Sequence, residues 1–248
     1  MTSRDERLAQ FYPDLMATGG LVTAINERAR HLGVPLGKVV PGRGSSGERS
    51  AALNSPTGYL AVTLSESKRR FIVRIWDRGV ELAAGGSPEL DDVVRVGFAW
   101  QSGRTLRGIK EEHAFLLFDE LAEAHERGDA VAFRWRMLRD DPDARIAALA
   151  VAAASVPEVA GLFPYLSHHT LRLSRVTGYP YTGDAPYVAP YSTPGPSYQV
   201  FAGDPVRVVA DTESAGEAIR AVADRLPPGY GPARAGTADD LEGGPGTP

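Results

Sequence analysis

Large apolar residues recur at every second position in two stretches of the chain, and a helical middle separates the two. In the first stretch the alternating apolar residues are Leu60, Val62, Leu64, Phe71, Val73 and Ile75. A period of two is typical of strands that bury one face. Polar turns at 66–69 and 77–79 divide the stretch, so we expect a three-stranded antiparallel meander over 59–83.

The second stretch has the same plan. Strands are predicted at 170–176, 198–201 and 206–209, and a helix follows over 213–226. The first meander is likewise followed by a helix, over 87–101. Each apolar position of the first helix has an apolar counterpart in the second helix at a constant offset along the chain. This correspondence fits either an internal duplication or the default pattern of any amphipathic helix.

These patterns predict an α+β fold with antiparallel sheets and flanking helices. Two strand–strand–helix units, in pseudo-halves 14–102 and 142–226, would surround a helical middle at 111–140. A strand pair with one helix cannot bury both of its faces, so we expect the two units to share one interior. The prediction is a single domain over 1–233, followed by a Gly- and Pro-rich disordered tail at 234–248.

Composition excludes several classes of function. The chain has 248 residues and no cysteine, which excludes disulfide scaffolds, thiol nucleophiles and Cys-ligated metals. Its net charge of −4 argues against nucleic acid as a partner. The most apolar run, 146–156, is much shorter than the roughly 20 residues that cross a bilayer. With no secretory signal at the start, we expect a soluble, cytoplasmic protein with no membrane partner.

Residues 162–187 carry the densest set of reactive and polar side chains. The candidate catalytic residues are His168, His169 and Asp184. The candidate ligand-binding residues are Arg172, Arg175, Tyr179, Tyr181 and Tyr187. If the two histidines begin the strand at 170, their side chains point to opposite faces, one shared with Arg172 and the other with Arg175.

Residues 162–187 allow two interpretations. A histidine facing Asp184 is a candidate general base, while tyrosine hydroxyls and a guanidinium suit an anionic or planar ligand. Alternatively, the segment is a polar outer strand face beside a tyrosine-packed loop. The adjacent histidines lack the i,i+4 spacing of a helical metal site, and no cofactor motif is present, so neither metal nor cofactor is expected.

Four motifs resemble an uncharacterised actinobacterial family, a domain of unknown function often labelled "natural product biosynthesis protein". They are Phe118–Asp129, Leu162–His168, Thr177–Pro180 and Leu226–Pro232, and the likeness spans most of residues 58–233. The resemblance implies an association with secondary metabolism. It transfers no reaction, cofactor or catalytic residue.

The sequence therefore leaves two functional hypotheses. One is an accessory, non-catalytic or chaperone-like module that binds a protein or peptide partner from a biosynthetic pathway, favoured by the absence of any complete catalytic signature. The other is a cofactor-independent acid–base enzyme that acts on a small metabolite through a His/Asp/Arg/Tyr pocket. Convergence of His168 or His169, Asp184 and an arginine on one concavity distinguishes them.

Overall fold

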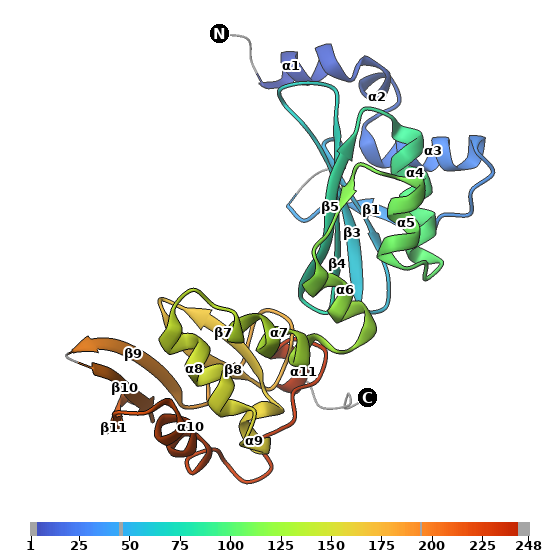
Figure 1. Ribbon diagram of the computed structural model, residues 1–248. Coiled ribbons are helices and arrows are strands. Elements are labelled where there is room, and N and C mark those ends of the chain that lie inside the picture. Colours follow the sequence, from blue (N-terminus) through green and yellow to red (C-terminus); the bar gives the residue numbers. More distant parts are fainter. Residues whose placement is uncertain (1–3, 45–46, 194, 243–248) are drawn as a thin grey trace. The chain divides into compact units, whose positions relative to one another are not determined.

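A computed structural model describes residues 4–44, 47–193 and 195–242. The chain forms two compact units, Met1–Glu126 and Arg127–Pro248, and each has an antiparallel sheet of its own (Figure 1). The predicted α+β fold class is confirmed. No helix of the described residues is long and apolar enough to pass through a bilayer.

The first unit contains a sheet whose strands are neighbours in chain order. They are β1 (Val39–Pro41), β2 (Ser50–Asn54), β3 (Gly58–Leu64), β4 (Phe71–Asp77), β5 (Val80–Ser87) and β6 (Leu116–Leu117). The predicted meander is confirmed as β3–β5. The sheet extends beyond it because β2 pairs with β3 on one side and β6 pairs with β5 on the other.

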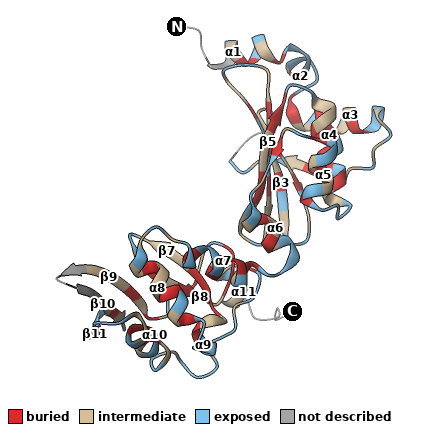
Figure 2. Ribbon diagram, in the orientation of Figure 1, coloured by how far each residue is buried: buried red, intermediate tan, exposed pale blue. Residues whose placement is uncertain are grey.

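The helices of the first unit bury one face of this sheet. They are α1 (Arg4–Phe11), α2 (Pro13–Ala17), α3 (Leu21–His31), α4 (Leu90–Gln101), α5 (Leu106–Glu112) and α6 (Glu120–Arg127). Val73 and Ile75 of β4 are fully buried in the core that these helices cover, together with Val93 of α4 (Figure 2). On the opposite face, Tyr59 stacks on Trp76 with ring centroids 6.2 Å apart.

The second unit has a five-stranded sheet in the order β11-β10-β9-β8-β7. Its strands are β7 (Phe163–Ser167), β8 (Thr170–Ser174), β9 (Tyr187–Thr193), β10 (Gly195–Ala202) and β11 (Arg207–Thr212). Its helices are α7 (Ala130–Arg139), α8 (Ala144–Ala153), α9 (Pro157–Ala160), α10 (Ala215–Ala223) and α11 (Asp239–Glu242). Leu149 of α8, Leu171 of β8 and Ile219 of α10 are buried in one core.

The prediction of one interior shared by both sheets is wrong. Each sheet lies in a separate hydrophobic core, and the boundary between the units falls inside the predicted helical middle. Each meander is wide enough, with helices on one face, to bury a core without the other. The strand–strand–helix plan is nevertheless present in both units, as β4-β5-α4 and β10-β11-α10.

The predicted tail is also wrong over residues 234–242. Arg234 pairs with Val176, Gly178 N donates to Gly236 O over 2.8 Å, and Ala238 N donates to Pro180 O over 2.8 Å. These backbone hydrogen bonds satisfy polar groups of the segment and hold it against the neighbouring loop. Residues 243–248 lie outside the described part of the chain.

Candidate functional site

His168 and His169 form the turn of the β7–β8 hairpin. Ser167 pairs with Thr170, so the histidines are the two turn residues, with φ of 50° and 60°. Such a two-residue turn needs left-handed backbone at both positions, which matches the twist of the strands. The histidines therefore do not begin the strand, and the condition under which each would share a strand face with an arginine is not met. Both are exposed at the end of the hairpin, where His168 Nδ1 lies 3.2 Å from Ser167 Oγ.

The carboxylate of Asp184 is bound by other residues. Arg175 Nη2 donates to Asp184 Oδ2 over 2.9 Å, and the hydroxyl of Tyr230 donates to Oδ1. The Arg175 guanidinium also lies 4.9 Å from the centroid of the Tyr230 ring. Burial, reinforced by the bond to Asp184, raises the pKa of Tyr230 to about 12.

The predicted catalytic residues His168, His169 and Asp184 therefore do not form one site. In the described chain, neither histidine forms a hydrogen bond or an ion pair with Asp184. His169 instead lies near Asp143, whose pKa is lowered mainly by the hydrogen bond from Arg145 and to a smaller extent by His169. No three His, Asp or Glu side chains among the described residues gather in a way that suits a metal ion.

Most of the predicted ligand residues meet on the sheet face opposite the core of the second unit. We call this surface the tyrosine–arginine face; it consists of Tyr165, Arg172, Tyr181, Tyr187 and Phe201. Because Leu171 and Leu173 enter the core, Arg172 points to the other side of β8. Its guanidinium carbon lies 4.1 Å from the centroid of the Tyr187 ring.

Aromatic stacking continues on both sides of Arg172. Tyr187 stacks on Phe201 of β10 with centroids 5.0 Å apart and rings within 6° of parallel. On the other side Tyr165, which is opposite Arg172 in the register, stacks on Tyr181 at 4.4 Å. Tyr179 meets the Tyr181 ring edge-on at 6.0 Å and is 72% exposed.

Charges of both signs act on the tyrosine–arginine face, because Asp184 as well as Arg172 lies near Tyr165. Arg172 forms no ion pair with any carboxylate of the described residues; its Nε donates to Thr170 Oγ1 over 3.3 Å. Burial raises the pKa of Tyr165, and the nearby charge of Arg172 opposes this. Burial also raises the pKa of Tyr181, where Arg134 has the opposing role. Both phenols therefore keep their protons at neutral pH and remain hydrogen-bond donors.

Of the other two predicted ligand residues, Tyr179 lies at the edge of this face against Tyr181, and Arg175 lies elsewhere, with Asp184 and Tyr230. Sequence reasoning missed two members of the tyrosine–arginine face, Tyr165 and Phe201. The signal for Phe201 is the strand pattern at 198–201. Once β9 is paired with β10, that pattern places an aromatic ring opposite Tyr187.

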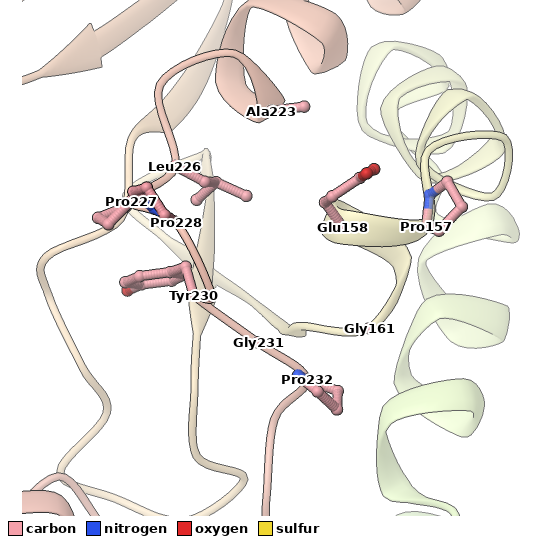
Figure 3. A pocket seen from close by; sticks show the side chains of 11 residues that line it. Pro157, Glu158, Gly161, Ala223, Leu226, Pro227, Pro228, Tyr230, Gly231 and Pro232 are labelled. Atoms are coloured by element: carbon pink, nitrogen blue, oxygen red, sulfur yellow. The ribbon is translucent and has the colours of Figure 1, made fainter.

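Sequence reasoning also missed a cavity of about 460 Å³ in the same unit (Figure 3). We call it the proline-lined cavity. Its lining residues are Pro157, Glu158, Gly161, Ala223, Leu226, Pro227, Pro228, Gly229, Tyr230, Gly231 and Pro232. Tyr230 connects this lining to Asp184 and hence to the loop after β8. The Pro-Pro-Gly-Tyr-Gly-Pro run at 227–232 is the signal from which such a rigid wall is expected.

Comparison with known proteins characterises one part of the chain. No curated protein matches it, and no solved structure matches it. One family model does match, within the second unit, and its range includes both the tyrosine–arginine face and the proline-lined cavity. Residues 129–237 match a family of unknown function (DUF6193).

Proposed function

We propose that this chain is an accessory, non-catalytic binding module of natural product biosynthesis. Its tyrosine–arginine face would dock an acidic segment of a partner protein. The observation that supports the proposal is the position of Arg172, which lies over the Tyr187 ring and has no ion pair with a described carboxylate. The association with biosynthesis rests on the resemblance of the motifs at 118–129, 162–168, 177–180 and 226–232.

The chemistry of this face favours a carboxylate next to a planar group. A guanidinium stacked on an aromatic ring keeps its edge free to donate to a carboxylate, and partial burial strengthens that bond. Arg172 is half-buried. Its Nε donates to Thr170 and its side chain also hydrogen-bonds to the Tyr165 hydroxyl, so a carboxylate of the partner would accept from the remaining guanidinium hydrogens. The ring of Tyr179, which is 72% exposed beside Tyr181, offers stacking area to an aromatic side chain of the partner.

The acid–base alternative has less support. General-base catalysis by a histidine needs an orienting partner and a substrate site within hydrogen-bond reach. His168 and His169 lie on an exposed turn, and Asp184 is already bound by Arg175 and Tyr230. A binding role requires no such pair, only a surface with unsatisfied donors.

Isothermal titration with two synthetic peptides tests the docking surface. One alternates glutamate and tyrosine over five residues, and the other has glutamine in place of each glutamate. We expect the acidic peptide to bind at least about tenfold more tightly, and Arg172→Gln to remove that advantage. Arg139→Gln is the matched control, because Arg139 is exposed on α7. Equal affinity of the two peptides, or of wild type and Arg172→Gln for the acidic peptide, contradicts the proposal.

A deletion strain of the native producer tests the biosynthetic role. Complementation with wild type should restore the metabolite profile, whereas Arg172→Gln should not. His168→Ala and His169→Ala should restore it, because a docking module does not use them as bases. Restoration by Arg172→Gln together with failure of either histidine variant would favour the acid–base enzyme.

A further inference from the structure

We infer that the proline-lined cavity is a second, separate binding site, and that it takes a small organic amine with Glu158 as the counter-charge. Its volume of about 460 Å³ lies in the range of small-molecule sites. The walls come from α9, the end of α10 and the segment 226–232, which are all parts of the second unit. None of the lining residues belongs to the tyrosine–arginine face.

The walls of this cavity are held in place before any ligand binds. Four of the lining residues are prolines, whose φ is fixed. The segment 226–232 is tied down at its end, where Ala233 N donates to Gly161 O over 2.8 Å. A methyl group added at Gly161 would come within 3.3 Å of Pro232 Cβ, so these two walls are closely packed. Because the walls are already ordered, ligand binding carries only a small entropic cost for ordering them.

The charge of this lining is a single carboxylate. Glu158 is the one acidic or basic side chain among the eleven lining residues, and it forms no ion pair with a described residue. Figure 3 shows it extending from α9 into the space between Ala223 and Pro157. The hydroxyl of Tyr230, the other ionisable group, is occupied by Asp184.

These features select among ligands by charge. Ala223, Leu226 and the prolines offer apolar area to any small hydrocarbon body. A carboxylate at the edge of that area repels an anion and attracts an ammonium group. The ligand class is therefore an amine on an apolar body, and the hydrogen bond from the ammonium to Glu158 provides the selectivity over a neutral analogue.

Three probes with the same apolar body test this inference on the full chain: 2-phenylethylamine, 2-phenylethanol and 3-phenylpropionate. Binding is followed by titration calorimetry and by ligand-observed NMR. We expect the amine to bind at least about tenfold more tightly than the alcohol, and the acid to bind most weakly. Glu158→Gln should remove the preference for the amine and leave the alcohol unchanged.

Two further variants separate this site from a general surface effect. Glu213→Gln changes the net charge by the same amount at an exposed position outside the lining, and it should bind the amine as wild type does. Leu226→Trp should fill the cavity and abolish binding of both amine and alcohol. Arg172→Gln should have no effect, so failure of the docking proposal would leave this one standing. Unchanged amine affinity in Glu158→Gln, equal affinity for amine and alcohol, or no binding of any probe overturns the inference.

Discussion

Tyr230 donates its hydroxyl hydrogen to the carboxylate of Asp184, although 46 positions separate the two residues. The bond ties the segment that lines the proline-lined cavity to the loop after β8. Arg175 reinforces it, because its guanidinium pairs with Asp184 and lies over the Tyr230 ring. Asp184 therefore organises two stretches of backbone in the second unit.

Removing this hydroxyl should alter stability at alkaline pH. Folding raises the pKa of Tyr230 from about 10 to about 12. Between these two pH values the folded chain keeps the phenol proton and the unfolded chain loses it. The resulting stabilisation is fully present below about pH 10 and is lost as the pH rises towards about 12. Tyr230→Phe should cost about 1 kcal/mol at about pH 8 and should unfold with a shallower alkaline dependence than wild type.

Urea titrations at several values between about pH 8 and about pH 11.5 measure this difference. Tyr179→Phe is the control, because Tyr179 is 72% exposed. Identical alkaline slopes for wild type and Tyr230→Phe would contradict the assigned role of the bond to Asp184.

The second unit should fold without the first. Its sheet and core contain residues of 127–248 alone, so a fragment with those bounds keeps the complete hydrophobic cluster. Trp135 is the one tryptophan of that fragment; it is 7% exposed, and its indole donates to Leu162 O over 3.0 Å. We expect a single cooperative urea transition in its fluorescence. A gradual, non-cooperative change would show that the unit needs the remainder of the chain.

Strands with an apolar residue at every second position could be predicted from the sequence. Strands without this pattern, which are recognised only by their pairing with a neighbouring strand, could not. β4 buries Phe71, Val73 and Ile75 on one face, and the period of two shows this directly. β7 contains a proline and two aromatic residues without a polar residue between them, so its sequence also fits the end of a helical block. Its strand conformation follows from pairing with β8, where Tyr165 is opposite Arg172.

The candidate site was predictable to a similar extent. Arg172 and Tyr187 lie close together in sequence and are in contact in the structure, while Tyr181 stacks on Tyr165. That these residues bind a ligand stays a prediction. The partner of Asp184 was not predictable, because Tyr230 reaches it through the tertiary fold. Glu158 belongs to no motif, and its significance arises only when α9, α10 and the segment 226–232 enclose a space.

The turn of the β7–β8 hairpin can be improved by design. A residue with a side chain costs about 1 kcal/mol or more in left-handed backbone, and asparagine followed by glycine is the pair that this turn type prefers. His168→Asn with His169→Gly should therefore raise the free energy of unfolding by about 1 kcal/mol. Thermal and urea unfolding of the double variant measure the effect. A destabilised variant would show that the histidine side chains make contacts worth more than the backbone strain.

In the first unit, Tyr12 joins a helical segment to the turn between β3 and β4. Its hydroxyl is 2.9 Å from the carbonyl oxygens of Ser65 and Arg70, and it accepts from Arg70 N over 3.0 Å. The Tyr12 side chain is fully buried, so Tyr12→Phe leaves polar backbone groups without this partner. We expect a loss of about 1–3 kcal/mol in unfolding free energy. Tyr59→Phe, at a position 42% exposed, should cost much less.

His113 should make the first unit sensitive to mild acid. The residue is 7% exposed, and burial lowers its pKa below the ordinary value, while Asp92, 3.8 Å away, acts in the opposite direction. His125 is shifted in the same direction, also mainly by burial.

The unfolded chain therefore takes up protons at a higher pH than the folded chain does. Stability is fully present above about pH 6.5 and is lost as the pH falls below that value. His113→Gln should flatten the loss of unfolding free energy between about pH 7 and about pH 5. His31→Gln, at an exposed position on α3, should leave it unchanged. An equal acid dependence in wild type and His113→Gln would show that burial of this ring does not disfavour its charged form.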